Sequence, residues 1–469
     1  MPDYATFAEL TRHLPNVLPD LIETVQQVKN RKFDTILVLD DDPTGTQTVY
    51  DLPVITSWQE GEIEQELVAG TPTCYLLTNS RSLPEPEAYF LGLRLGQKIH
   101  AAQQATNKRT LVISRGDSTL RGHYPSEVLA LEDGSGQRGV HFIIPAFFEG
   151  GRYTIGNVHY VRQGEQMIPA NETPFAQDKA FGYQHADLRK WVEEKTGGAV
   201  PVDFVASISI TDIRTRSVEA LTHQIDTLSP GDVCIVNAAE YSDLQQFAAA
   251  LLQSQVNPIC RTAASFVAAI DAKPSKPLLR PKDLGLNSAH GGLVMVGSYV
   301  PKSSEQLAHL RAHADLVEFE IDVPAMIEGN HPTSKEVSEQ IESHIRQGQS
   351  VLVFTSRKLI HADTPEESLA IGNRVSDFLT QLVSNLTVAP GFLLAKGGIT
   401  SSDIATRALN VKRGWAKGQV IPGVPVWELG PETRFPGMPY LIFPGNVGQT
   451  ESITHILQSL LPAVPTNPS

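Results

Sequence analysis

Short apolar segments alternate with longer amphipathic ones along most of this chain, and this alternation limits the folds open to it. Apolar runs such as TILVL and TLVIS read as strands buried on both faces, which is typical of parallel sheets covered by helices. Strands are predicted over 35–39, 74–78, 110–114, 141–145, 232–238, 292–297, 316–321, 350–355, 391–395 and 440–444. Helices are predicted over 18–30, 84–104, 184–195, 243–254, 302–313, 334–347, 365–386, 402–410 and 449–461. The sequence therefore predicts an α/β protein.

One stretch interrupts the alternation and reads as a linker. Residues 271–292 are rich in Pro, Lys and Gly and show no sustained periodicity, and a new strand begins at Gly292. A chain of 469 residues is long enough for two or three domains. We expect two domains, 1–275 and 276–469, each a mostly parallel sheet flanked by helices.

Composition narrows the classes of partner. The formal net charge of −14 argues against nucleic acid and anionic membranes, which need a basic face. No apolar run approaches the length of a membrane-spanning helix, and the N-terminal segment MPDYATFAEL lacks a signal-peptide core. Cys74, Cys234 and Cys260 lie in or beside apolar segments without metal-ligand spacing, so buried reduced thiols in a cytoplasmic protein are expected. Composition is compatible with a monomer or a homodimer.

Polar side chains follow the predicted strands of the first half, where parallel sheets bind ligands. The segment TILVLDDDPTGTQTV places three adjacent aspartates at the end of the first strand, and their mutual repulsion needs compensation. Gathered at one edge of the sheet, the strand ends supply Asp40, Asp41, Asp42, Asn79, Arg81, Arg115, Asp117, Ser118, Thr119, Arg121 and Arg152. Carboxylates orient hydroxyls and arginines bind carboxylates or phosphates, so this mixture favours a small, hydroxylated, anionic ligand.

The second half carries a different pattern. Three glycine-containing turns, GSYVPKS (297–303), AKGGITSSD (395–403) and FPGNVGQT (443–450), each follow a strand and lead into a helix. Such turns present backbone N–H groups to an anion, which predicts a phosphate-bearing ligand. None matches the GxxxxGK[ST] or GxGxxG patterns of common nucleotide sites. His123 and His159, by contrast, are expected to be hydrogen-bonded structural residues.

The aspartate segment taken alone also suggests a phosphatase. DDDPT fits the D-x-D-x-T pattern of haloacid-dehalogenase-type phosphatases, with Asp40 as nucleophile and Asp42 as acid, and YLLTN resembles their second motif. These enzymes also need a later lysine and an acidic pair for Mg²⁺, whereas RGDSTLRGHYP supplies arginines there. A phosphatase would leave the glycine-rich second half without a role.

The motifs taken together resemble the four-carbon acid sugar kinase family, over about residues 33–460. The resemblance is carried by DDDPTGTQT, TNSRSL, RGDSTLRG, PAFFEGGRYTIGNVHYV and ETPFAQD, followed by VMVGSYVPKS, AKGGITSSDIA, GQVIPGVPVW and FPGNVG. It implies an N-terminal sugar-acid-binding domain, a C-terminal nucleotide-binding domain and an active site in the cleft between them. The implied reaction is ATP- and Mg²⁺-dependent phosphorylation of the terminal hydroxyl of a threonate, erythronate or 3-oxo-tetronate.

The resemblance also implies site residues in this sequence. Asp41 or Asp42, Arg81 and Arg115 would be substrate residues. From the chemistry of these groups we expect Asp41 or Asp42 to bind the substrate hydroxyls or accept the proton of the attacking one, and Arg81 and Arg115 to hold the substrate carboxylate. The remaining substrate residues would be Gly116, Asp117 and Ser118, and the ATP residues would be Ser298, Gly397, Gly398, Ile399, Thr400 and Gly445. No Mg²⁺ ligand is assigned. Pro43, Gln47 and Ile399 depart from the family pattern, and Ile399 replaces an acidic residue, so a sensor without turnover is a further alternative.

Overall fold

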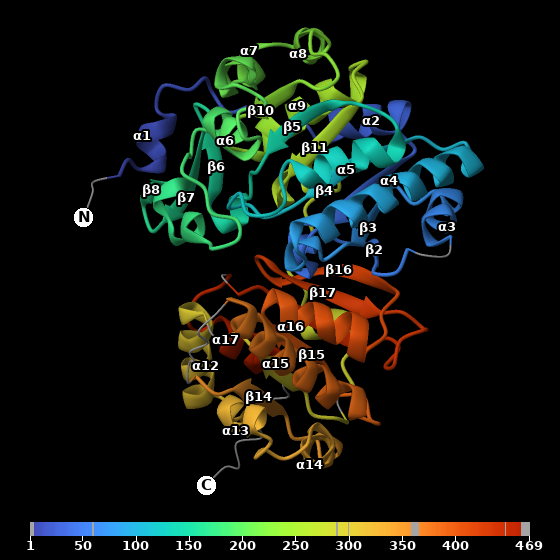
Figure 1. The fold of residues 1–469 in the computed structure, drawn as a ribbon, viewed down its shortest axis with the longest axis vertical. Coiled ribbons are helices and arrows are strands. Elements are labelled where there is room, and N and C mark those ends of the chain that lie inside the picture. Colours follow the sequence, from blue (N-terminus) through green and yellow to red (C-terminus); the bar gives the residue numbers. More distant parts are fainter. Residues whose placement is uncertain are drawn as a thin grey trace. The chain divides into compact units, whose positions relative to one another are not determined.

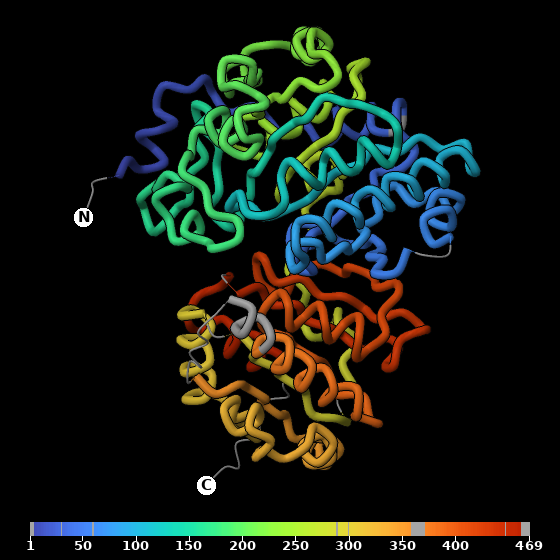
Figure 2. Tube along the Cα trace, in the orientation of Figure 1, coloured from blue at the N-terminus to red at the C-terminus, as the bar shows by residue number. Residues whose placement is uncertain are grey.

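The computed structural model describes residues 4–58, 61–287, 289–298, 300–357, 365–445 and 447–460, and these form two compact units (Figure 1). Unit 1 comprises Met1–Thr48 and Ser57–Ser275, and unit 2 comprises Val49–Thr56 and Lys276–Ser469. In Figure 2 the tube runs from blue to yellow-green through unit 1, and unit 2 combines the yellow-to-red part of the chain with the blue segment 49–56. Residues 49–56 lie inside the predicted first domain, yet they pack with unit 2, because β2 (Leu52–Ile55) pairs with β16 (Arg413–Ile421).

Unit 1 is built on a parallel sheet of seven strands, in the order β3-β1-β4-β11-β5-β10-β9. The strands are β1 (Thr35–Asp40), β3 (Thr73–Leu77), β4 (Thr110–Arg115), β5 (Val140–Ile144), β9 (Ala206–Ile208), β10 (Val233–Val236) and β11 (Pro258–Thr262). A small antiparallel sheet follows β5 and contains β6 (Arg152–Ile155), β7 (Val158–Gln163) and β8 (Gln166–Pro169).

Helices pack around the two sheets of unit 1. They are α1 (Phe7–Thr11), α2 (Ile22–Lys32), α3 (Glu62–Ala69), α4 (Glu85–Thr106), α5 (Ser126–Ser135), α6 (Leu188–Lys195), α7 (Ile210–Thr215), α8 (Val218–Ile225), α9 (Tyr241–Gln253) and α10 (Ala264–Asp271). Figure 1 shows α4 and α5 side by side, and α2, α8 and α10 each pack on α9. Strands β1, β3 and β5 are buried throughout, as parallel strands covered by helices must be.

Unit 2 has a mixed sheet in the order β13-β14-β12-β15-β18-β17-β16-β2, parallel from β13 to β18 and antiparallel beyond. Its further strands are β12 (Leu293–Val296), β13 (Val317–Ile321), β14 (Val351–Thr355), β15 (Leu393–Lys396), β17 (Val424–Leu429) and β18 (Pro439–Phe443). Its helices are α11 (Pro281–Leu284), α12 (Pro301–His313), α13 (Val323–Glu328), α14 (Ser334–Arg346), α15 (Pro365–Asn385), α16 (Gly398–Asp403) and α17 (Ser452–Leu460).

The two-domain α/β prediction is confirmed, and all ten predicted strands are present with ends shifted by at most two residues. The prediction missed β2, β6–β9, β11, β16 and β17, which are short, interrupted by Pro or Gly, or polar on one face. The helix predicted over 402–410 begins earlier, at Gly398, and ends in a π-helical turn, Ile404–Ala408. All three cysteines are free and buried, as predicted.

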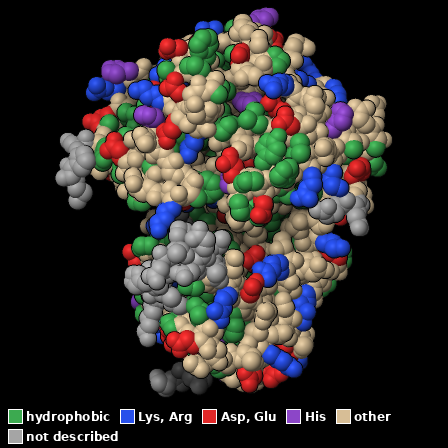
Figure 3. All heavy atoms as spheres, viewed as in Figure 1, with side chains coloured by type: hydrophobic (Ala, Val, Ile, Leu, Met, Phe, Trp, Pro, Cys, Tyr) green, Lys and Arg blue, Asp and Glu red, His purple; other side chains and the backbone are tan. Residues whose placement is uncertain are grey.

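Surface features add two observations. On the face shown in Figure 3, basic and acidic side chains are interspersed over both units. Within the described residues, no helix has the length and apolar character that crossing a membrane requires.

Candidate functional site

The carboxyl ends of the unit 1 strands gather a group of carboxylates and guanidinium groups, which we call the strand-end cluster. It contains Asp40, Asp41, Asp42, Arg81, Arg115, Asp117, Arg121 and Asp178. The register of the parallel sheet accounts for its centre, because Asp40 in β1 is the Cα partner of Arg115 in β4. Partners on neighbouring strands point to the same face, so the two charges meet.

Asp40 is the deepest member of this cluster and is 1% exposed. Its Oδ1 lies 3.3 Å from Arg115 Nη1 and 3.4 Å from the backbone nitrogen of Asp42. The turn after the aspartates presses against it, since a Cβ at Gly45 would lie 1.9 Å from Asp40 Oδ2. Burial raises the pKa of the Asp40 carboxyl to about 7, with Arg115 opposing and Asp41 and Asp42 reinforcing the shift. A carboxylate covered in this way is a poor nucleophile for a phosphatase.

Asp41 is also buried, and it is locked by Arg81 through two hydrogen bonds. Arg81 Nε donates to Oδ2 at 3.1 Å and Nη2 donates to Oδ1 at 2.7 Å. Burial alone would raise the pKa of Asp41, but the Arg81 guanidinium outweighs it and the pKa lies below its ordinary value. Arg115, 4% exposed, approaches the same carboxylate at 3.8 Å from beneath. The ligand contact expected of Arg115 stays a prediction, and its burial favours a supporting role.

Asp42 and Asp117 are more accessible than Asp40 and Asp41. Asp42 begins the η1 turn (Pro43–Thr46), where its Oδ1 accepts a hydrogen bond from Thr44 N at 2.8 Å. Its Oδ2 lies 3.6 Å from Arg81 Nη1, and its side chain is 17% exposed. Asp117 Oδ1 lies 3.9 Å from the same nitrogen, and its Oδ2 accepts from Arg121 Nε at 2.8 Å. Arg81 Nη1 thus faces two carboxylates with no short hydrogen bond to either.

The loop from Gly116 to Gly122 is held by residues that the sequence did not assign to the site. The Arg261 guanidinium, at the end of β11, lies so close beneath that a Cβ at Gly116 would come within 1.5 Å of Nη1. Ser118 accepts a hydrogen bond through its carbonyl from His159 Nε2 at 2.7 Å, and His159 Nδ1 lies 3.0 Å from Thr154 Oγ1. Burial lowers the pKa of His159 to about 4, so the ring is neutral and Nε2 carries the proton.

The expectation of structural, hydrogen-bonded histidines is confirmed. His123 Nε2 lies 3.2 Å from the carbonyl of Ser80 and 3.0 Å from that of Leu83, and thereby holds the turn that presents Arg81. Arg261 was missed because its strand, PICRT, begins with Pro258 and was not predicted. An arginine within an otherwise apolar run was the signal that could have revealed it.

The glycine-containing turns of unit 2 also meet, and we call them the glycine-turn cluster: Ser298, Gly397, Gly398, Thr400 and Gly445. They follow β12, β15 and β18, which are neighbours in the sheet. Gly397, with φ +114°, donates through its N–H to the Phe443 carbonyl at 2.9 Å. A Cβ there would lie 3.1 Å from Ser298 Cβ, and one at Gly445 would lie 3.9 Å from Ser298 Oγ. Because α16 begins at Gly398, residues 398–400 form its first turn.

Two cations of unit 2 were missed by the sequence analysis. Lys396 is fully buried, and its Nζ donates to the carbonyls of Pro444 at 2.6 Å and Gly445 at 3.0 Å, joining two of the turns. Burial lowers the pKa of Lys396 to about 7, reinforced by Lys302. Arg357, after β14, donates through Nη1 to the Ser298 carbonyl at 2.5 Å, and its Nε and Nη2 have no partner among the described residues. Ile399, in contrast, is 62% exposed.

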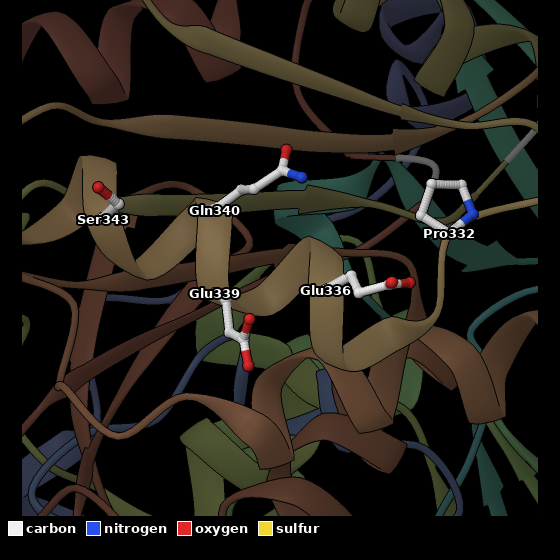
Figure 4. Close-up of a pocket in the computed structure, with 5 residues that line it drawn as sticks. All are labelled: Pro332, Glu336, Glu339, Gln340 and Ser343. Atoms are coloured by element: carbon white, nitrogen blue, oxygen red, sulfur yellow. The ribbon is translucent and has the colours of Figure 1, made fainter.

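Neither a further surface hollow nor a metal site adds a strong candidate for the functional site. A hollow of about 630 Å³ lies on unit 2 and is lined by Pro332, Glu336, Glu339, Gln340 and Ser343, four of them on α14 (Figure 4). Glu336 already caps α14 through Thr333, and the hollow shares no residue with either cluster. Among the described residues, no group of three or more His, Cys, Asp or Glu side chains is arranged to hold a metal ion.

Comparisons with known proteins agree with the fold. A model described as a sugar-binding N-terminal domain matches residues 36–270, and one described as a nucleotide-binding C-terminal domain matches residues 293–453. A D-erythronate kinase of Heliobacterium modesticaldum is 24% identical over 366 residues, which cover 74% of this chain and 78% of that protein.

Solved structures share the fold at low identity. A Haemophilus influenzae protein has a TM-score of 0.62 at 16% identity and covers 91% of this chain and 100% of its own. A Salmonella typhimurium LT2 protein has a TM-score of 0.66 at 15% identity and covers 92% and 100%. The two matched domains span most of the sequence in the order that the motifs predict. This chain belongs to the four-carbon acid sugar kinase family.

Proposed function

We propose that this protein transfers the γ-phosphoryl group of ATP to the terminal hydroxyl of a four-carbon sugar acid of the threonate, erythronate or 3-oxo-tetronate type. The observation that carries the proposal is the accessible part of the strand-end cluster, in which Arg81 Nη1 faces Asp42 and Asp117. It offers hydrogen-bond acceptors for hydroxyls beside a guanidinium for an anion. The match to a sugar-binding domain and the D-erythronate kinase relative support it.

Within this proposal, Asp42 accepts the proton of the attacking hydroxyl. Its Oδ2 is free of short hydrogen bonds, whereas both oxygens of Asp41 are engaged by Arg81. Asp41 therefore fixes Arg81 in place, and Gly116, Asp117 and Ser118 shape the surface on which the substrate lies. Positioning and charge neutralisation account for most phosphoryl-transfer catalysis, and this arrangement supplies both.

The glycine-turn cluster is the proposed site of the ATP phosphates. Ser298, Gly397 to Thr400 and Gly445 would bind them through backbone N–H groups, and Arg357 would add a positive charge. Mg²⁺ in such sites is held largely by phosphates and waters with one or two carboxylates, so a dedicated metal cage is not required. Bound Mg²⁺ would neutralise phosphate charge. Two expectations stay predictions: that the active site lies between the two domains, and that the protein forms a homodimer.

A coupled assay of ADP release over a panel of four-carbon acids tests the proposal. ADP formation that depends on the acid is the expected result. Phosphate release from a phosphomonoester without ATP would favour a phosphatase instead. Stabilisation by an acid, with no turnover in the presence of ATP, would favour a sensor. The burial of Asp40 argues against the phosphatase, because its proposed nucleophile cannot reach phosphorus without displacing the Gly45 turn.

A further inference from the structure

Two guanidinium groups near the strand-end cluster form no ion pair with a carboxylate of the described residues. Arg81, Arg115 and Arg121 each pair with aspartates, as described above. Arg152 and Arg261 form no ion pair with any described residue, and Arg152 Nε and Arg261 Nη1 are buried without a hydrogen-bond partner. A buried cation without an opposite charge lowers stability, so a buried unpaired arginine suggests a functional role that offsets this cost.

Arg261 is the more enclosed of the two, with 7% of the residue exposed. Its Nη2 donates to the carbonyl of Arg121 at 3.2 Å, and a Cβ at Gly122 would lie 2.7 Å from that nitrogen. Both glycines of RGDSTLRG therefore leave room for the Arg261 side chain. Enclosed beneath the loop, Arg261 supports it and adds positive potential rather than reaching a ligand.

Arg152 is half-buried and lies at the start of β6. Its backbone pairs with Phe147, which lies three residues after the end of β5 (Arg152 N to Phe147 O, 2.8 Å). Its Cζ lies 6.0 Å from the centre of the Phe147 ring and 5.8 Å from that of Phe175, and Nη1 donates to the Gly150 carbonyl. Two rings and one carbonyl thus fix the guanidinium before any ligand binds.

Arg152 also borders the accessible carboxylates. Arg121, which pairs with Asp117 and Asp178, lies over the same Phe175 ring at 5.3 Å. Burial lowers the pKa of Arg152, and Asp117 partly offsets the effect. The motifs PAFFEGGRYTIGNVHYV and ETPFAQD supply Phe147, Arg152 and Phe175, and these residues have no other role in the proposed reaction.

We propose that Arg152 binds the carboxylate of the sugar acid and thereby selects acids over neutral polyols of the same length. This inference rests on the proposed function. A planar guanidinium matches a carboxylate with two parallel hydrogen bonds, and a fixed, unpaired guanidinium gains most from one. Arg81 can add only a single contact to the anion, through Nη1, because its Nε and Nη2 are already used by Asp41.

The test compares Arg152→Gln and Arg152→Lys with Arg162→Gln in the full chain. Arg162 lies on the neighbouring strand β7, is 40% exposed and pairs with Glu165, so it is a matched control. Steady-state ADP release is measured with D-erythronate and D-threonate and with the polyols erythritol and threitol. Arg152→Gln should raise the KM for the acid about 30-fold or more, while the KM for ATP and kcat change less than about threefold.

The other variants and the melting temperature separate loss of the carboxylate contact from a general loss of structure. Arg152→Lys keeps the positive charge but loses the planar group that can make two parallel hydrogen bonds, so it should give an intermediate KM for the acid. Arg162→Gln should have the same KM as the wild type. The preference for acid over polyol should collapse in Arg152→Gln alone. Because no ion pair is lost, its melting temperature should stay near that of the wild type. An unchanged KM for the acid in folded Arg152→Gln overturns the inference while leaving the kinase proposal intact.

Failure of the proposed function can be told apart from failure of this inference. If the wild type shows no acid-dependent ADP release, the kinase proposal fails. Calorimetric titration of the same acids without ATP then measures directly how strongly the Arg152 site binds the acid. Binding by the wild type and Arg162→Gln but not by Arg152→Gln supports the Arg152 site. A wild type that binds none of these acids overturns both.

Discussion

Arg81 and Asp41 form a two-point contact, with Nε 3.1 Å from Oδ2 and Nη2 2.7 Å from Oδ1. The pair divides the three adjacent aspartates into different roles. Asp40 lies beneath it against Arg115, Asp41 is held within it, and Asp42 remains accessible beside it. The repulsion expected among three neighbouring carboxylates is thus balanced by two arginines, Arg115 on β4 and Arg81 in the turn that follows β3.

Asp42→Asn should lower kcat at least about 100-fold, the scale of a lost general base, because the amide cannot accept the hydroxyl proton. Steady-state ADP release with a four-carbon acid measures the effect. Asp203→Asn, an exposed carboxylate on η6 (Val202–Phe204) of the same unit, is the control and should not change turnover. Near-normal turnover in Asp42→Asn would remove Asp42 from the mechanism.

Arg81→Gln should lower the free energy of unfolding by about 3 kcal/mol, because it leaves the Asp41 carboxylate buried without its partner. Urea denaturation measures the loss. Adding Asp41→Asn to Arg81→Gln should restore part of the stability, since the uncompensated charge is removed. For comparison, Arg109→Gln breaks an exposed pair with Asp34 and should cost less than about 1 kcal/mol. Equal losses in both single variants would contradict the prediction.

Gly45→Ala should destabilise the protein by about 1–3 kcal/mol, because the new methyl group would overlap the Asp40 carboxylate. Gly372→Ala is the matched control: no atom lies within 4 Å of a Cβ there, and the residue belongs to α15. In a helix this change is expected to be neutral or stabilising. Thermal denaturation of both variants checks the contrast, and a neutral Gly45→Ala would show that the turn can move away from Asp40.

Asp40 should make stability depend on pH near neutrality. The pKa of Asp40 is about 7 in the folded protein against its ordinary value of 3.8, so the folded state binds the proton more tightly. The resulting stabilisation is complete below about pH 4 and is lost as the pH rises to about 7. Asp40→Asn cannot titrate, so the wild type should lose stability relative to this variant as the pH rises from about 4 to about 7. Parallel pH profiles of the two proteins by urea denaturation would contradict the prediction.

Gly398→Val should raise the KM for ATP about tenfold or more, because a branched side chain in the first turn of α16 would crowd the N–H groups proposed for the phosphates. The KM for the sugar acid serves as the internal control and should not change. Both constants come from one set of ADP-release assays. Unchanged ATP kinetics would show that the glycine-turn cluster is not the phosphate site.

The sequence by itself determined ten strands of the two large sheets, because strands buried on both faces leave continuous apolar runs that can be recognised locally. It also determined which strand ends carry carboxylates, arginines and glycine turns. It could not predict β11, whose Pro258 and Arg261 obscure its apolar pattern, or β2, which pairs with β16 from a distant part of the chain.

Only the tertiary structure decided how the charges are shared. Neighbours in sequence such as Asp40, Asp41 and Asp42 look equivalent, yet register and burial give them different partners. The same applies to the arginines: pairing neutralises Arg81 and Arg115, whereas Arg152 is left without a carboxylate among the described residues. Whether each of these side chains is ionised, and whether it is free to bind a ligand, depends on its distance to opposite charges and on the exclusion of water. Only the folded chain fixes both.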